Sequence, residues 1–149
     1  MANAIELITS DHRKVEQLYQ RYQGANGQSQ SKQAIIQEVC HELTTHAQLE
    51  EEIFYPVVEG QLGSEGATLV KEARKEHSEM KRAIGQLQTR QFAGPECAQV
   101  FQTLMTGVQH HVKEEESEML PRAQQQLGAE SERLGALMQE RKQALRVDK

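Results

Sequence analysis

The chain has 149 residues, about one domain's worth and enough to bury a substantial core, and its formal charge is −5. An acidic chain lacks the basic surface of a nucleic-acid-binding protein or of one that docks on anionic lipid, and no apolar run approaches the roughly 18 residues that span a bilayer. Helix-forming residues dominate and aromatic residues make up only 4%, so the composition favours helices over a sheet.

Apolar residues recur at helical spacing in five segments, at about residues 4–22, 31–59, 67–89, 95–127 and 130–146. Loop-forming residues at 24–31 separate the first two segments, and Ser31 is the predicted N-cap of the second. Residues 60–66 predict a turn, and Gly94-Pro95 predicts the break before the fourth segment.

These segments predict an all-α fold, an antiparallel up-down-up-down four-helix bundle over about 4–127 with a short fifth helix near the C-terminus. We expect a single domain, residues 1–149. Cys40 and Cys97 show no metal-type spacing and the N-terminus lacks the pattern of a secretory signal. A reducing cytoplasm with both thiols free is therefore the expected location, and a disulfide between the two cysteines stays open.

The two halves of the chain repeat each other with an offset of 65 residues. His12 matches His77, and residues 46–56 (HAQLEEEIFYP) match residues 111–121 (HVKEEESEMLP). Each half therefore predicts a helix with one histidine, followed by a helix with a His-x3-Glu pair. The proline that closes each matched segment should kink or end its helix, because its ring removes a backbone hydrogen bond.

The repeat predicts a metal centre inside the bundle. In His-x3-Glu the two side chains share a helical face about one turn apart, so each such helix offers an imidazole nitrogen and a carboxylate to one site. With the lone histidines, six potential metal ligands converge: His12, His46, Glu50, His77, His111 and Glu115. Two metal ions bridged by Glu50 and Glu115, with two histidines each, would use all six, and imidazole suits iron, zinc, copper or nickel.

A bundle without metal is the competing interpretation. A lone histidine on an apolar helix face is more often a hydrogen-bonded core residue, and consecutive glutamates usually form a solvated face. We interpret Glu51, Glu52 and Glu116 in that second way. For the six predicted ligands together this interpretation is weak, because burying them without a cation would carry a heavy desolvation penalty.

Five other polar residues are less constrained. His41 is expected at the surface, because it lies about 140° around the helix from His46. His110 lies about 100° from His111 and is expected at the surface, with a boundary position or support of a ligand as the alternative. Glu16 and Glu42 are either hydrogen-bond partners of the ligands or ordinary boundary carboxylates. Tyr19 lies two turns from His12 on the same face and is the tyrosine predicted to matter for redox chemistry, whereas the other tyrosines are expected in the core.

These motifs resemble those of the hemerythrin family, specifically the bacterial HHE cation-binding domains. The matching features are Asp-His at 11–12, Glu-His at 76–77, and His-x3-Glu-Glu-x4-Pro at 46–56 and again at 111–121. The resemblance covers about residues 4–127. It implies an up-down-up-down bundle that holds two iron ions in an oxo- or hydroxo-bridged, non-haem centre.

The chain departs from the oxygen-carrying members of that family. Ala73 stands where they have a fifth histidine, one turn before His77, and Ile8 is the equivalent residue on the first helix. The last carboxylate is Glu115, where the carriers use an aspartate one residue later. Fewer histidines leave more open coordination at the metals, which favours sensing, iron handling or reaction with oxygen, peroxide or nitric oxide over stable oxygen carriage.

Four functions remain in competition. The first is a di-iron protein that binds or reacts with such a small ligand, in sensing, iron handling or stress defence. The second is a di-iron enzyme of the peroxide-decomposing (catalase- or peroxidase-like) or oxidase type, in which open metal positions act as Lewis-acid and redox sites. An iron donor for iron–sulfur cluster repair usually carries an added Cys-containing N-terminal segment, and a structural zinc prefers a closed site, often with cysteine. The sequence indicates no nucleic-acid or membrane partner and leaves a protein partner open.

Overall fold

The computed structural model describes residues 3–25 and 27–147, and every regular element within them is a helix. The elements in chain order are α1 (Ala4–Gly24), α2 (Ser29–Leu49), η1 (Glu50–Phe54), α3 (Tyr55–Thr89), α4 (Pro95–Glu114), η2 (Glu115–Met119), α5 (Leu120–Leu127) and α6 (Glu130–Val147). The elements η1 and η2 are single turns of π-helix. Asn26, part of the predicted loop at 24–31, lies outside the described residues.

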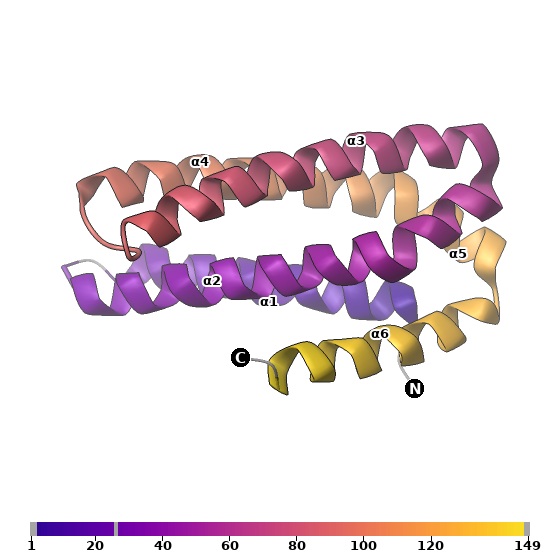
Figure 1. Cartoon of the computed structure of the whole chain (residues 1–149), viewed down its shortest axis with the longest axis horizontal. Coiled ribbons are helices and arrows are strands. Elements are labelled where there is room, and N and C mark those ends of the chain that lie inside the picture. The colour runs from indigo at the N-terminus through magenta and orange to yellow at the C-terminus, as the bar shows by residue number, and fades with distance from the viewer. Residues whose placement is uncertain (1–2, 26, 148–149) are drawn as a thin grey trace.

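Four long helical arms make up the bundle (Figure 1). The first arm is α1, and the second is α2 continued through η1 into the start of α3. The third arm is the rest of α3, and the fourth is α4 continued through η2 into α5. The first arm packs beside the second and the third beside the fourth, while α6 runs along the outer side of α1 and α2. The predicted four-helix bundle with a fifth, C-terminal helix is confirmed.

Local sequence determines where the arms begin and turn. Asn3 caps α1, because its side-chain oxygen accepts a hydrogen bond from the backbone N–H of Glu6 at 2.8 Å. The predicted cap at Ser31 is wrong, since α2 begins at Ser29. Between the second and third arms the chain turns at Gly63, whose φ of 67° and ψ of −143° only glycine adopts readily. The turn predicted at 60–66 is therefore concentrated at one residue.

Neither Pro56 nor Pro121 ends its helix. Each follows a π turn: in η1 the carbonyl of Glu50 accepts a hydrogen bond from the N–H of Tyr55, and η2 repeats this arrangement from Glu115. Because proline has no N–H to continue the α-helical pattern, the wider turn before it accommodates the break. Both π turns begin at a predicted bridging glutamate.

Buried apolar residues form two clusters, one on each side of a polar layer. Along α1, Ala4 and Ile8 belong to one cluster, Val15 and Leu18 belong to the other, and His12 lies between them. The other arms also contribute residues to both clusters, in alternating chain order because neighbouring arms run antiparallel. The polar layer is therefore flanked by apolar packing in both directions along the bundle.

The two cysteines are both buried in the cluster that contains Val15, and both are free thiols. Burial, with a contribution from Cys97, raises the pKa of the Cys40 thiol to about 12, which makes it a poor nucleophile. The disulfide that the sequence left open is not formed. Over the described part of the chain, no helix combines the length and apolar character needed to cross a membrane.

Candidate metal centre

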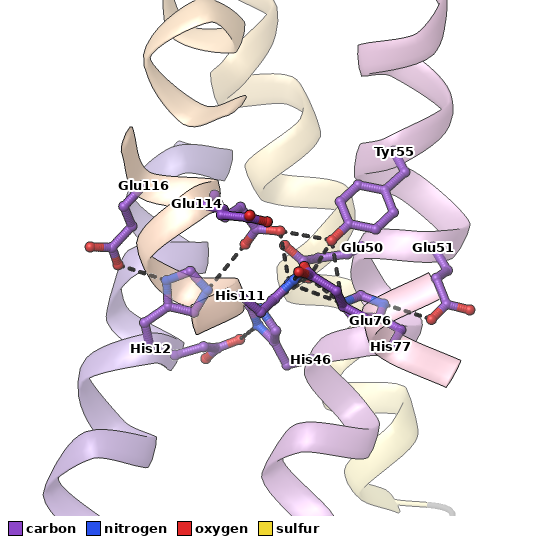
Figure 2. Close-up of polar contacts among 12 residues, drawn as sticks. His12, His46, Glu50, Glu51, Tyr55, Glu76, His77, His111, Glu114 and Glu116 are labelled. Carbon is purple, nitrogen blue, oxygen red and sulfur yellow. Dashed lines mark hydrogen bonds and ion pairs between the residues drawn. The ribbon is translucent and has the colours of Figure 1, made fainter. Parts of the chain in front are cut away.

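All six predicted ligands meet in the polar layer. Figure 2 shows five of them: His12, His46, Glu50, His77 and His111. Each arm supplies one histidine, and each π turn begins with one of the two glutamates. The six side chains are buried, and Glu50 and Glu115 are only 0% and 2% exposed. Carboxylates are almost never buried this fully unless they are paired or bind a cation.

Potential ligand atoms form two neighbouring groups. In the first group, His12 Nε2 lies 3.1 Å from Glu115 Oε1, and His46 Nε2 lies 3.2 Å from Glu50 Oε1. Ligand atoms of these four residues all lie within 4.8 Å of one another. This group therefore has the donors and the spacing to surround one cation.

The second group is built around the two histidines of the other half of the repeat. His77 Nε2 lies 3.1 Å from Glu50 Oε1 and 3.2 Å from His111 Nε2, and His111 Nε2 lies 3.2 Å from Glu115 Oε2. Glu50 is thus shared by both groups. Two adjacent cation positions with a carboxylate between them follow from this arrangement.

Four buried atoms of this layer make no hydrogen bond with the described residues: His12 Nε2, His46 Nε2, Glu50 Oε2 and Glu115 Oε1. The contacts of the two histidine nitrogens with carboxylate oxygens at 3.1 and 3.2 Å are close enough for a hydrogen bond but are not aligned as one. Buried polar atoms are nearly always hydrogen-bonded, and an unsatisfied one costs about 1–3 kcal/mol. Imidazole nitrogens and carboxylate oxygens that face one another in this way are the donor set that transition-metal ions prefer. The residues present therefore fit a pair of metal ions.

Outside the layer, the Nδ1 atom of each histidine is held by a carboxylate. Within each half, Asp11 Oδ2 lies 2.9 Å from His46 Nδ1, and Glu76 Oε1 lies 2.6 Å from His111 Nδ1. A carboxylate on Nδ1 fixes the orientation of the ring and directs Nε2 toward the centre, as in metal-binding histidines generally.

Glu51 and Glu116 make the matching contacts between the halves. Glu51 Oε2 lies 2.7 Å from His77 Nδ1, and Glu116 Oε2 lies 2.7 Å from His12 Nδ1. The prediction that these two glutamates form a solvated face is wrong, because a neighbouring arm closes over that side of the helix and leaves their side chains 23% and 27% exposed. The signal was present in the repeat, since the offset of 65 also relates Glu51 to Glu116.

Basic side chains lie beyond three of these four outer carboxylates. The pairs are Arg13–Glu116, Lys81–Glu51 at 3.0 Å and Lys142–Asp11 at 2.7 Å. Beyond the fourth carboxylate, Glu76, the side chain of His110 lies 3.6 Å away and is largely exposed. Three of the four histidines are therefore held by a carboxylate that forms an ion pair with a basic side chain.

Tyr55, predicted only as a core residue, also belongs to the site. It is fully buried, and its hydroxyl donates to Glu115 Oε2 at 2.7 Å and lies 3.1 Å from Glu50 Oε1 and 3.3 Å from His77 Nε2. The repeat places Leu120 at the equivalent position. A phenol therefore stands at only one of the two repeat-related positions.

The structure also places the five less constrained residues and Glu52. Tyr19 packs in an aromatic cluster with Tyr22 and Phe101. Glu16 and Glu42 form ion pairs with Arg13 and Lys14 rather than hydrogen bonds with a ligand. His41 is half-buried rather than exposed, whereas His110 is exposed as predicted and contacts Glu76. Glu52 is exposed and pairs with Arg141, which agrees with its predicted place on a solvated face.

Charges within the layer compensate one another. Burial alone would raise the pKa of Glu50, but the facing histidines hold it well below its ordinary value. Burial would lower the pKa of His46 and His111, yet the carboxylates around them raise these pKa values to about 10 and about 12. Burial and the two glutamates raise the pKa of Tyr55 well above its ordinary value, so its hydroxyl stays protonated. In the metal-free protein protons occupy the layer, and a bound metal ion replaces them.

Three hollows reach this layer. A groove of about 680 Å³ between α3 and α4 is lined in part by Ala73, His111 and Glu115. A groove of about 240 Å³ between α1 and α4 reaches His12. A cavity of about 20 Å³ is bounded by all four histidines and by apolar side chains of the adjoining cluster. A small molecule can therefore approach the layer from more than one side.

Comparisons with known proteins agree with this geometry. The family model described as the hemerythrin HHE cation-binding domain matches residues 3–123. A hemerythrin-like protein of Schizosaccharomyces pombe is 30% identical over 130 residues, which are 87% of this chain and 64% of that protein. A protein of Nostoc named DNA nickase is 34% identical over 128 residues, which are 86% of this chain and 35% of that protein. The chain thus spans less than two thirds of the length of both relatives.

A solved structure gives the same result in three dimensions. The crystal structure of a hemerythrin HHE cation-binding domain-containing protein from Mycobacterium kansasii matches this structure with a TM-score of 0.83. The match covers 99% of this chain and 90% of that chain, at 25% sequence identity.

Proposed function

The chain belongs to the family of hemerythrin HHE cation-binding domains, and on that premise we propose that its six buried ligands hold two iron ions that bind or react with a small molecule. Oxygen, peroxide and nitric oxide are the candidate molecules, and sensing, iron handling or stress defence the candidate roles. The observation that carries the proposal is the set of buried imidazole nitrogens and carboxylate oxygens that face one another without hydrogen-bond partners.

Each half of the repeat would hold one ion. His12 and His46 would bind the first, His77 and His111 the second, and Glu50 and Glu115 would lie between them. This assignment is supported by the two groups of ligand atoms and by the position of Glu50 in both. Two histidines for each ion leave coordination positions open, which a carrier of small molecules or a catalyst needs and a structural metal site does not.

A bound iron pair supplies Lewis-acid and redox chemistry. The residues of the chain prepare the surroundings for it. The outer carboxylates orient the four rings, and the apolar clusters on both sides exclude water. Tyr55 keeps the proton on its hydroxyl and donates it in a hydrogen bond to Glu115 at 2.7 Å, which would hold that carboxylate in place.

The cavity beside the histidine rings suits a small, uncharged molecule. Its volume of about 20 Å³ exceeds the roughly 10–15 Å³ needed for one water. Besides the histidines and Asp11, it is lined by apolar side chains: Val15, Leu43, Ala47, Met80, Val108 and Val112. An apolar lining favours a diatomic molecule over a charged one, which supports oxygen or nitric oxide as the ligand.

A second candidate is a di-iron enzyme that decomposes peroxide or acts as an oxidase. The groove between α3 and α4 favours it, because this groove is much larger than a diatomic molecule requires and is lined in part by His111 and Glu115. The Tyr55 hydroxyl beside Glu115 would provide a hydrogen-bond donor close to where peroxide would bind.

The chain spans 35% of the Nostoc relative, and its formal charge of −5 does not favour binding to a nucleic-acid backbone.

The first test is elemental analysis of aerobically purified protein, with its visible spectrum recorded before and after addition of peroxide. We expect about two irons per chain, and loss of iron and of its absorption bands in His46→Ala and Glu115→Ala. Glu96→Ala is the control, because Glu96 is an exposed carboxylate of α4 that pairs with Arg90, away from the ligands. Its iron content should equal that of the unmodified protein.

The outcomes separate the candidates. Steady-state consumption of peroxide would favour the enzyme, and a stable spectral change on adding nitric oxide or oxygen without turnover would favour the binding role. Folded protein that binds no iron under any loading condition would refute the proposal.

A further inference from the structure

Helix α6 lies outside the residues matched by the family model, which end at 123, yet it packs directly on the elements that carry the site. It contacts α1, α2 and η1 (Figure 1). Leu134 and Met138 anchor it, since both are 2% exposed within the cluster that contains Ile8. The helix therefore packs firmly on the outside of the bundle, beside the polar layer.

Two basic residues of α6 point toward α1 and η1, and they differ in burial. Arg141 pairs with Glu52 at 3.0 Å, and both side chains are about two-fifths exposed. Lys142 pairs with Asp11 at 2.7 Å, and these side chains are only 16% and 12% exposed. Exposed ion pairs contribute about 0–1 kcal/mol and specify little geometry, whereas a lysine is seldom buried without a definite partner.

Lys142 is the outer end of a line of contacts that leads to the centre. Its Nζ lies 2.7 Å from Asp11 Oδ1, and Asp11 Oδ2 lies 2.9 Å from His46 Nδ1. His46 Nε2 then lies 3.2 Å from Glu50 Oε1. Both oxygens of Asp11 are therefore engaged, one by α6 and one by the histidine. A carboxylate fixed at both ends holds the imidazole ring in a single orientation.

The repeat supplies an internal comparison. Glu76 is the counterpart of Asp11 and holds His111 through Oε1, but its Oε2 faces the exposed His110 at 3.6 Å. Helix α6 thus supports the histidine of one half through Lys142, and the equivalent support in the other half is weaker.

We propose that Lys142 is a positioning residue of the metal centre, which acts through Asp11 on His46 so that the docked α6 tightens the metal position formed by His12 and His46. The position formed by His77 and His111 shares Glu50 with it, but its histidines are held by Glu51 and Glu76, which pair with Lys81 and His110 rather than with α6, so we expect a smaller effect there. This inference rests on the proposed two-metal function and adds to it a difference between the two ions.

The test uses the full chain loaded with two Co²⁺ ions, because the visible absorption of Co²⁺ reports its ligands. The dissociation constants of both ions are measured by competition with a chelator. In Lys142→Met, which keeps the length of the side chain but removes its charge, we expect one of the two constants to rise about tenfold, at the low end of the range for residues that orient metal ligands. The absorption of that one ion should also change.

Two variants control for general effects. Arg141→Met removes the neighbouring exposed charge and should leave both constants unchanged. Lys142→Arg restores a cation and should recover most of the lost affinity. Thermal unfolding of the metal-free variants verifies that each is folded.

Each outcome has one meaning. Unchanged constants in Lys142→Met, or an equal loss for both ions, would overturn the inference while the two-metal function stands. Failure of the unmodified chain to bind two ions would refute the proposed function first, and this inference with it.

Discussion

Replacing Tyr55 by phenylalanine should destabilise the metal-free protein more than the metal-loaded protein. The side chain is fully buried, and phenylalanine fills nearly the same space, so the change removes the hydroxyl and little packing. That hydroxyl lies 2.7 Å from Glu115 Oε2 and 3.1 Å from Glu50 Oε1. A hydrogen bond to a charged group contributes about 1.5–3 kcal/mol, so the loss of one strong and one longer contact should cost about 3 kcal/mol.

Metal binding should reduce this cost. Bound cations neutralise the same two carboxylates, and the remaining loss should fall to about 1 kcal/mol, the net contribution of an ordinary hydrogen bond. The measurement is urea and thermal unfolding of both proteins, with and without metal. For a chain of this length, about 3 kcal/mol corresponds to a melting temperature about 6–12 °C lower.

A matched control is Tyr22→Phe. The ring of Tyr22 packs against Phe101 in the other apolar cluster. Removing its hydroxyl should change the free energy of unfolding by less than about 0.5 kcal/mol in either state. Equal losses for Tyr55→Phe in the two states, or a loss below about 0.5 kcal/mol in the metal-free protein, would refute the reasoning.

Three further predictions follow from the geometry. Because the pKa values of His46 and His111 are raised from 6.5 to about 10 and about 12, their contribution to the stability of the metal-free protein is complete below pH 6.5. That contribution is lost as the pH rises through about 10, which chemical unfolding across this range will measure. Gly63→Ala should cost about 1–3 kcal/mol of unfolding free energy, because alanine is strained at a φ of 67° and ψ of −143°. Ala73→Leu should narrow the groove beside His111 and slow the reaction of the loaded protein with peroxide by stopped-flow absorption, without changing its metal content.

Each of these three has a contrasting case. The metal-loaded protein should lose metal as the pH falls, since protons compete for the ligands, so the same alkaline decline in both states would contradict the pH prediction. Gly60→Ala is the control for Gly63→Ala, because Gly60 has helical backbone angles and open space around it. It should stabilise the protein by about 0.5–1 kcal/mol. An unchanged peroxide rate in Ala73→Leu would indicate entry through the groove between α1 and α4 instead.

Much of the fold could be predicted because it depends on periodicity and on the repeat. Apolar spacing located the five helical segments, and the offset of 65 residues selected the six residues that meet in the polar layer. Helix ends were less predictable. The cap expected at Ser31 is absent because α2 starts earlier, and the second arm turns at a single glycine, Gly63, rather than over the whole glycine-rich segment.

The outer parts of the centre were harder to predict, for two physical reasons. Whether Glu51 is solvated depends on which neighbouring arm closes over it, and a single helix does not contain that information. Tyr55 follows Glu50 by five residues, which on an α-helix is about 140° away from its face. The π turn bonds these two residues directly and thereby places the phenol beside the carboxylate. The π turn forms where Pro56 lacks the N–H that an α-helix would use, and the spacing of apolar residues does not reveal it.

The contacts that cross between the halves make the centre cooperative. His12 is held by Glu116 of the second half, and His77 is held by Glu51 of the first, so each cation position takes one of its supports from the opposite half. Local unfolding of either half would weaken both positions at once. Metal occupancy would then vary in an all-or-none manner with the folding of the bundle, and a fragment containing a single half would have five of the ten side chains that make up the ligands and the outer carboxylates.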